Sequence, residues 1–252
     1  MAVNKAKRRM LEGKQALGVE VGLGAPLSAE LLSPLGFDYI VVDQQHGNWE
    51  DASTTHAFRS IGLGSAVPMA RVVENDFGLI GRLLDKGAMG IIVPMVNTVE
   101  QAEAAAQAMR FPPRGGRSGG NFGTGFLGPD YMDWIDDEVF LAVQIESVQA
   151  KDHAEEIMAV DGVDGCWIGP NDLAMSMGID RNTPEGQAAH TEAIESIIEA
   201  CKKTNKIPGI STGSVESAQP WLDRGCLFVT VGEDTGWMLD GAMETLRKIG
   251  RA

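Results

Sequence analysis

The sequence predicts a (β/α)8 barrel, also called a TIM barrel. Eight short apolar runs are separated by segments with helical periodicity, and this alternation continues to the C-terminus. The runs are almost continuously apolar, which is typical of parallel strands buried on both faces. No linker interrupts the alternation, so a doubly wound sheet is less favoured than one barrel domain over residues 1–252.

The predicted strands follow a polar helical segment at residues 3–13. They cover residues 17–21, 39–42, 67–71, 90–94, 140–145, 163–168, 207–210 and 228–231. Side chains that cap helix N-termini precede three of the helical segments, at Ser28, at Asn75 and Asp76, and at Thr98. Glycines suited to left-handed C-caps stand at Gly36, Gly87 and Gly225.

Composition narrows the class of protein. The chain has 35 acidic and 21 basic residues and a formal net charge of -14, which disfavours binding to nucleic acid or to an anionic membrane. No run reaches the length of a membrane span, and no apolar signal segment is present at the N-terminus. We therefore expect a soluble cytoplasmic protein. The widely spaced Cys166, Cys201 and Cys226 are predicted to be buried apolar residues, not disulfide partners or zinc ligands.

Charged residues gather where the predicted strands end, which is where barrel enzymes carry their chemistry. Asp43 and His46 follow the second strand, and Arg71 ends the third. Glu146 follows the fifth strand, and Asp172 lies in the Gly-Pro-Asn-Asp-Leu segment after the sixth. If these strands are neighbours, all of these side chains lie at one end of the barrel.

Glu146 and Asp172 predict a divalent metal site. Carboxylate oxygens suit magnesium, manganese or cobalt, and two protein ligands leave positions for water and substrate. The alternative is that Glu146 caps the following helix and that Asp172 is the N-cap of a helix that starts at Leu173.

Three other residues have two interpretations each. Arg71 could stabilise a developing enolate oxygen opposite a metal or form an ordinary surface ion pair. His46 could transfer protons near neutral pH or be a satisfied loop histidine. Asp43 could be a site residue or a buried hydrogen-bond acceptor. For Asp85, at the end of the third predicted helix, the residue pattern alone predicts only a solvated side chain at a helix end.

A glycine-rich segment contains a Gly-x-Gly-x-x-Gly match at residues 123–128. It follows no predicted strand and ends at Pro129, so we do not interpret it as a nucleotide-binding turn. Residues 114–130 are instead predicted to be a mobile loop over the open end of the barrel.

In combination, these motifs resemble the HpcH/HpaI family of metal-dependent (class II) 2-oxo-acid aldolases. The resemblance covers nearly the whole chain. Its blocks are GFDYIVVDQQH, the Arg71 strand, RLLDKGAMGIIVPMV, RFPPRGGRSGG, VQIES, VDGVDGCWIGPNDLAMSMG and CLFVTVGEDTGWM.

The resemblance implies an enzyme that reversibly cleaves a 4-hydroxy-2-oxo acid to pyruvate and an aldehyde. It makes Glu146 and Asp172 the ligands of a Mg, Mn or Co ion, and Arg71 the group that polarises the oxo group and stabilises the enolate with the metal. His46, oriented by Asp85, would transfer protons. The pyruvate site would also include Gln144 beside the metal, with the pyruvate carboxylate held by backbone amides of the turn formed by Gly169, Pro170, Asn171 and Asp172.

The resemblance also implies a homo-oligomer, a trimer or hexamer, in which the last helix is exchanged between subunits. Met238, Ala242 and Leu246 form an apolar stripe that could pack on a neighbour or close its own barrel. One departure is Gln45, where many members have a glutamate beside the histidine. The alternatives are a citryl- or malyl-CoA lyase on the same barrel and a non-catalytic barrel that binds an oxo acid.

Overall fold

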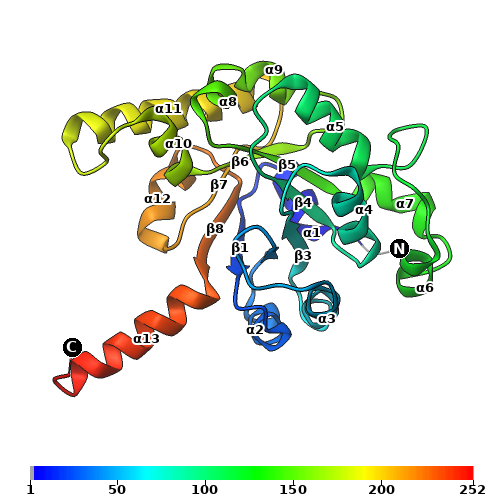
Figure 1. Cartoon of the computed structure of the whole chain (residues 1–252), viewed down its shortest axis with the longest axis horizontal. Coiled ribbons are helices and arrows are strands. Elements are labelled where there is room, and N and C mark those ends of the chain that lie inside the picture. The colour runs from blue at the N-terminus through cyan, green and yellow to red at the C-terminus, as the bar shows by residue number, and fades with distance from the viewer. Residues whose placement is uncertain (1–2, 252) are drawn as a thin grey trace.

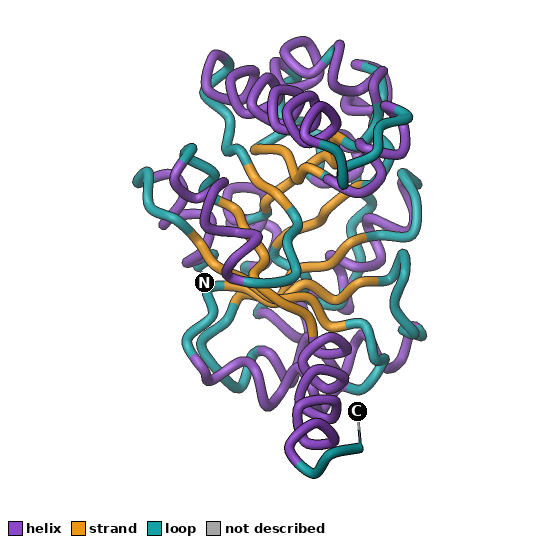
Figure 2. The backbone as a smooth tube through the Cα atoms, turned by 90° about the vertical axis from the view of Figure 1, so that its left-hand side faces the viewer, coloured by secondary structure: helices purple, strands orange, loops and turns teal. Residues whose placement is uncertain are grey.

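The computed structural model describes residues 3–251 and contains a closed barrel of eight parallel strands in sequential order. This confirms the predicted fold. The strands are β1 Ala16–Val21, β2 Tyr39–Asp43, β3 Val67–Arg71, β4 Gly90–Val93, β5 Phe140–Ile145, β6 Gly165–Ile168, β7 Gly209–Ile210 and β8 Phe228–Glu233. The two views in Figures 1 and 2 show the strands in the middle of the molecule, with helices around them.

The helices alternate with the strands and form the outer layer of the barrel. They are α1 Lys5–Leu11, α2 Pro26–Leu32, the 3-10 turn η1 Ser33–Leu35, α3 Asp51–Ile61, α4 Phe77–Asp85, α5 Val99–Met109, α6 Asn121–Leu127, α7 Tyr131–Glu138, α8 Val148–Asp152, α9 Ala154–Ala159, α10 Pro170–Met177, α11 Pro184–Lys203, α12 Val215–Asp223 and α13 Asp234–Lys248.

Two of the predicted N-caps are confirmed and one is wrong. Asp76 accepts from the amide of Leu79, and Thr98 accepts from the amide of Gln101. Ser28 does not begin α2, because this helix starts two residues earlier at Pro26, whose ring favours the first helical position. The Ser28 hydroxyl bonds instead to Asp234 at the start of α13.

Aromatic rings fill the barrel interior near the N-terminal ends of the strands. The Tyr39 and Phe228 rings lie 4.5 Å apart, and Phe140 lies 5.1 Å from Phe228. A Cβ at Gly18 would lie 2.2 Å from the Tyr39 ring, so only glycine fits on β1 beside it. Because these rings fill the half of the interior at the N-terminal ends of the strands, the space inside the barrel lies towards the C-terminal ends.

Helix α1 covers the N-terminal end of the barrel beside β4, β5 and β6. The Asn4 side chain donates to the carbonyls of Met89 and Glu138, both at 2.9 Å. Lys7 Nζ donates to the carbonyl of Val139 at 2.7 Å and lies 3.2 Å from Asp164. These bonds hold α1 against the segments that lead into β4, β5 and β6, and they satisfy the buried polar groups of Asn4 and Lys7.

Helix α13 projects away from the barrel (Figure 1). Only its first residue is buried: Asp234 accepts from the amide of Gly22 and the hydroxyl of Ser28, both at 2.8 Å. Met238 and Leu246 of the predicted stripe are 60% and 38% exposed, so the stripe does not close its own barrel. The expectation that α13 packs on a second copy stays a prediction.

No helix between residues 3 and 251 is both long and apolar enough to cross a membrane. The three cysteines are free and buried, as predicted.

Candidate active site

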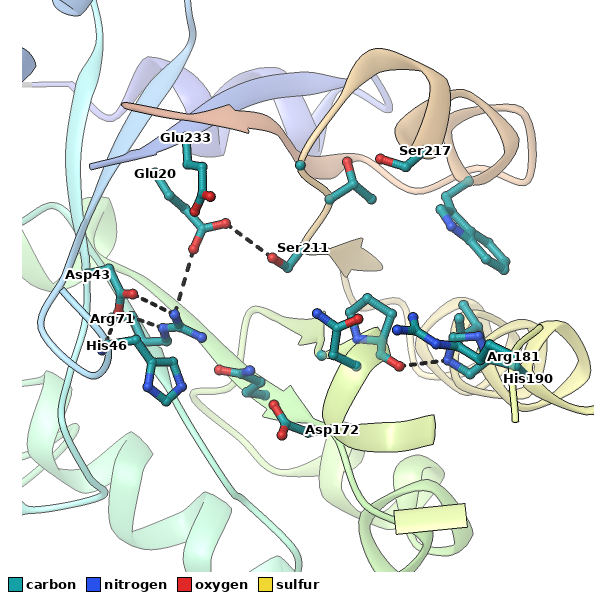
Figure 3. A pocket seen from close by; sticks show the side chains of 18 residues that line it. Glu20, Asp43, His46, Arg71, Asp172, Arg181, His190, Ser211, Ser217 and Glu233 are labelled. Carbon is teal, nitrogen blue, oxygen red and sulfur yellow. Dashed lines mark hydrogen bonds and ion pairs between the residues drawn. The ribbon is translucent and has the colours of Figure 1, made fainter. Parts of the chain in front are cut away.

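A cavity of about 730 Å³ lies at the C-terminal ends of the strands (Figure 3). Its walls include seven of the predicted site residues: His46, Arg71, Gln144, Gly169, Pro170, Asn171 and Asp172. Glu146 is buried beside the wall and is bonded to Gln144. The structure therefore brings together every predicted site residue except Asp85.

Arg71 ends β3 and is held by Asp43, which faces it in the register of β2 and β3. The Arg71 Nε and Nη2 groups donate to the two oxygens of Asp43 at 2.8 and 2.6 Å, and the guanidinium lies 5.2 Å from the Trp167 ring. Burial disfavours the charged form, but the hydrogen bonds and charge of Asp43 raise the pKa of Arg71 overall. Arg71 is thus a fixed buried cation in the cavity wall and not a surface ion pair.

Glu146 follows β5 and has both of its oxygens fixed. Oε1 accepts from the amide of Met95 at 2.8 Å, and Oε2 accepts from the Gln144 amide at 2.5 Å. Burial raises the pKa of Glu146, the Met95 bond opposes this, and the negative charge of Asp172 adds to the increase. The capping alternative is wrong, because Ser147 caps the helix that follows.

Asp172 is the third residue of α10, whose N-cap is Gly169. The alternative of a cap before Leu173 is therefore wrong. The carboxylate of Asp172 has no hydrogen bond or ion pair with residues 3–251. A Cβ at Gly169 would lie 2.6 Å from Oε2 of Glu146, so glycine is what lets this turn approach Glu146 closely.

The predicted set of backbone amides in this turn needs a correction. The Gly169 amide donates to the carbonyl of Ile145 at 3.2 Å, and Pro170 has no N–H. Asn171 and Asp172 retain amides in the first turn of α10, where the helix dipole favours an anion.

The donor atoms present suit a hard divalent cation. Glu146 and Asp172 lie close enough for the charge of Asp172 to raise the pKa of Glu146. The Gln144 Oε1 atom is buried and has no hydrogen-bond partner, so a third oxygen is available nearby. Over residues 3–251 no three His, Cys, Asp or Glu side chains gather as a metal cage. An ion here would take two carboxylates from the protein and keep open positions, and this ligand set stays a prediction.

His46 lies in the loop after β2, at the same side of the cavity as Arg71 (Figure 3). Its backbone amide is 3.4 Å from Asp43 Oδ1, which anchors the loop to the Arg71 pair. The imidazole bonds to no side chain within the described part of the chain. The interpretation of a satisfied loop histidine is therefore not supported.

Asp85 is not next to His46 in this chain. It ends α4, outside the cavity, and one of its oxygens accepts from Arg117 Nη2 at 2.7 Å. Arg117 is buried between the rings of Phe111 and Tyr131. The Asp85 side chain remains 33% exposed, so a partner from outside the chain can reach it.

The glycine-rich segment differs from its prediction in two ways. Residues Asn121–Leu127 form α6 and so are helical. None of the described side chains of 114–130 lines the cavity, because Arg117 ties this segment to the end of α4 and to α7. The expected loop over the open end of this barrel is wrong.

Sequence reasoning missed Glu20, which lies in β1 and lines the cavity. Its carboxylate is 3.7 Å from Arg71 Nη2. The available signal was a single charged residue inside an apolar strand. Burial raises the pKa of Glu20 to about 7, although the positive charge of Arg71 opposes this.

His190 and Arg181 were also missed, because both lie in segments that look like ordinary helical or loop surface. They line the end of the cavity away from Arg71 (Figure 3). His190 Nε2 bonds to the carbonyl of Pro170 at 2.8 Å, which braces the turn that carries Asp172. Burial lowers the pKa of His190, and the charge of Arg181 adds to this.

Comparison with known proteins agrees with this architecture. The family described as HpcH/HpaI aldolase/citrate lyase matches residues 20–240. A hydroxypyruvate/pyruvate aldolase of Cupriavidus necator is 38% identical, with 93% of this chain and 88% of that protein covered. A 4-hydroxy-2-oxo-heptane-1,7-dioate aldolase of Klebsiella pneumoniae is 37% identical, with 95% and 91% covered.

Among solved structures, an HpcH/HpaI aldolase/citrate lyase family protein from Burkholderia cenocepacia superposes with a TM-score of 0.89. It is 28% identical and covers 98% of this chain and 99% of its own.

Proposed function

Because the chain belongs to the HpcH/HpaI aldolase/citrate lyase family, we propose that it is a metal-dependent pyruvate aldolase. It cleaves a 4-hydroxy-2-oxo acid reversibly to pyruvate and an aldehyde, and is therefore a carbon–carbon lyase. Relatives named as hydroxypyruvate/pyruvate aldolase and 4-hydroxy-2-oxo-heptane-1,7-dioate aldolase support this assignment.

One observation carries the proposal. A buried arginine, clamped through two hydrogen bonds to Asp43, lines the same cavity as Asp172, and Glu146 is buried beside its wall. Neither Glu146 nor Asp172 forms an ion pair within residues 3–251. Cleavage of the C3–C4 bond leaves its electron pair on the pyruvate fragment as an enolate. A preorganised guanidinium stabilises the negative oxygen of this enolate without having to reorganise.

Glu146 and Asp172 would hold the divalent cation, which is magnesium, manganese or cobalt. When bound, this ion supplies Lewis-acid polarisation of the 2-oxo group. Gln144 fixes one oxygen of Glu146, and His190 braces the turn of Asp172. The free amides of Asn171 and Asp172 bind the substrate carboxylate at the positive end of α10.

His46 is the proton-transfer group in this proposal. In the cleavage direction it removes the proton of the C4 hydroxyl, and in the synthetic direction it returns that proton to the aldehyde oxygen. Its exposed imidazole at the Arg71 side of the cavity supports this role. Since Asp85 is distant in its own chain and partly exposed, we propose that it orients His46 of an adjoining subunit.

We further propose that the whole chain acts as one barrel domain in a homo-oligomer, a trimer or hexamer, through exchange of α13. The uncovered apolar side chains of α13 support exchange. A cytoplasmic location is consistent with three buried cysteines that form no disulfide.

Deuterium exchange into the methyl group of pyruvate tests the function without knowledge of the aldehyde. We expect exchange in D2O when Mn²⁺, Co²⁺ or Mg²⁺ is present, and none after chelation. Exchange that persists at full rate in excess chelator would contradict the metal. Pyruvate binding without any exchange would instead indicate a non-catalytic barrel.

A further inference from the structure

Glu20 occupies the cavity wall opposite the predicted metal ligand Asp172 (Figure 3). It lies in β1, in register with Val41 of β2 and with Glu233 at the end of β8. Its side chain is 13% exposed, and that exposed part faces the cavity. The mechanism proposed above does not use this residue, although it is a carboxylate placed beside the catalytic arginine.

The two oxygens of Glu20 have different surroundings. Oε1 accepts from the hydroxyls of Ser211 at 3.1 Å and Thr230 at 3.2 Å. Ser211 directly follows β7, and Thr230 lies in β8. Among residues 3–251, the one polar partner of Oε2 is Arg71 Nη2, and their separation of 3.7 Å is too long for a hydrogen bond. One oxygen is thus held in place by the protein, while the other is free to accept a hydrogen bond from a substrate.

The position of Glu20 Oε2 determines which part of the substrate can form a hydrogen bond with it. Arg71 is the group that binds the oxo oxygen, and Oε2 of Glu20 lies within 3.7 Å of its guanidinium. A substrate that engages Arg71 therefore has its remaining carbons beside this wall. Ser211 already donates its hydroxyl proton to Glu20, so it too presents lone pairs to the cavity. This wall of the cavity therefore presents hydrogen-bond acceptors to the substrate and few donors.

The charge of the wall disfavours an anion. Glu20 and Glu233 both line it, and the adjacent cation Arg71 is already paired with Asp43. Arg181, and His190 when protonated, lie at the other end, and His46, on the Arg71 side, is the proposed proton-transfer group. A second carboxylate on the aldehyde would be repelled here, whereas a hydroxyl would be bonded.

We propose that Glu20, positioned by Ser211 and Thr230, binds a hydroxyl group on the aldehyde fragment, so that the natural acceptor is a neutral 2-hydroxyaldehyde. The cleaved substrate is then a 4,5-dihydroxy-2-oxo acid. This inference rests on the proposed aldolase function and adds the chemical class of the acceptor and a residue that determines it.

The test compares acceptors that differ only in the hydroxyl. Initial rates with pyruvate and Mn²⁺ at about pH 8 are measured for glycolaldehyde and for acetaldehyde, and their kcat/KM ratio is determined. We expect the ratio to fall about 10- to 100-fold from wild type to Glu20→Ala, and less for the isosteric Glu20→Gln. Both acceptors react with the same enolate, so effects on enolate formation cancel, as does their intrinsic difference in reactivity.

Glu233→Gln is the matched control, because it removes a carboxylate from the same wall that lacks the Ser211 and Thr230 bonds. An unchanged ratio in both Glu20 variants would overturn the proposal. Equal decreases in Glu20→Gln and Glu233→Gln would also overturn it, since they would indicate a general field effect. So would a wild-type preference for succinic semialdehyde over glycolaldehyde, which would point to Arg181 and an anionic acceptor.

Pyruvate deuterium exchange by the wild-type enzyme separates the two levels of inference. If exchange occurs and the hydroxyl preference is absent, the acceptor class is wrong and the aldolase function stands. If wild-type protein with metal shows no exchange, the function itself is wrong.

Discussion

Arg71 depends on Asp43 for its geometry as well as for its charge. The two hydrogen bonds to Asp43 use Nε and one terminal nitrogen, which leaves the other terminal nitrogen for the proposed contact with the substrate. The rigid fork can point in one direction only, since the Trp167 ring supports its face. This pairing turns a flexible side chain into a preorganised donor.

Replacement of Arg71 should therefore separate charge from geometry. We expect Arg71→Ala to lower kcat/KM for cleavage by about 10²- to 10³-fold. Arg71→Lys should restore little of the lost kcat/KM, because an ammonium group cannot form both hydrogen bonds to Asp43. Steady-state cleavage rates are the measurement. Circular dichroism and thermal melting control for the unpaired Asp43 that either variant leaves. Wild-type rates in a folded Arg71→Ala protein would rule out the enolate role.

Glu20 makes stability depend on pH in a predictable direction. Burial raises its pKa from 4.5 to about 7, with Arg71 opposing and Asp43 adding to the shift, so the folded state binds its proton more tightly than the unfolded state does. The contribution of this group to stability is full below about pH 4.5 and is lost as the pH rises through about 7.

The Glu20→Gln variant lacks this titration. We expect it to gain stability relative to wild type between about pH 4.5 and 8, by about 3 kcal/mol at most. Urea unfolding of both proteins across this range measures the difference, and Glu233→Gln is again the control. A difference between Glu20→Gln and wild type that stays constant with pH would show that Glu20 is not buried as described.

At the scale of elements, the turn between β6 and α10 sets the geometry of the proposed metal site. It brings Asp172 onto a helix start, and its glycine lets the backbone pass against Glu146. The carbonyl of Pro170 is tied to His190 of α11, so a second helix sets the position of the turn. If Glu146 and Asp172 hold the metal as proposed, its affinity depends on β5, β6, α10 and α11 together.

A methyl group at Gly169 should disturb this site without unfolding the barrel. The new Cβ would lie 2.6 Å from Glu146 Oε2, so the carboxylate must move. We expect Gly169→Ala to weaken Mn²⁺ binding by about 10-fold or more, measured by calorimetry or by electron paramagnetic resonance. Gly213→Ala is the control, since Gly213 lines the same cavity and its Cβ meets nothing within 4 Å. Equal affinities in the two variants would contradict the proposed ligands.

At the scale of the whole molecule, two features are incomplete in a single chain. Met238, Leu239 and Leu246 of α13 are exposed. The His46 imidazole has no side-chain partner within residues 3–251, while Asp85 is partly exposed outside the cavity. A symmetric oligomer would satisfy both, because the same interface that covers α13 can bring Asp85 to a neighbouring active site.

This arrangement predicts complementation between inactive variants. His46→Ala and Asp85→Asn should each have low activity alone, whereas coexpressed hybrids should recover about a quarter of wild-type activity. With random mixing, about a quarter of the sites shared by two subunits contain an intact His46 from one subunit and an intact Asp85 from the other. Cleavage assays on hybrids verified by mass spectrometry measure this. Hybrids that stay inactive would place His46 and Asp85 in separate roles.

The sequence by itself determined the barrel, the order of its elements and the residues at the strand ends. These depend on local patterns: apolar runs define strands, caps define Asp76 and Thr98 as helix starts, and strand ends place Arg71, Glu146 and Asp172 at one face. The family resemblance added the roles of these residues, which stay predictions, and the family match supports an aldolase.

Only the tertiary structure decided which of these side chains meet. Asp43 clamps Arg71 because β2 and β3 pair in one register, and Glu20 joins them because β1 closes the barrel against β8. Asp85 stays outside because Arg117, far along the chain, binds it at the end of α4. Such contacts depend on the shear and closure of the whole sheet, and no local sequence pattern encodes those.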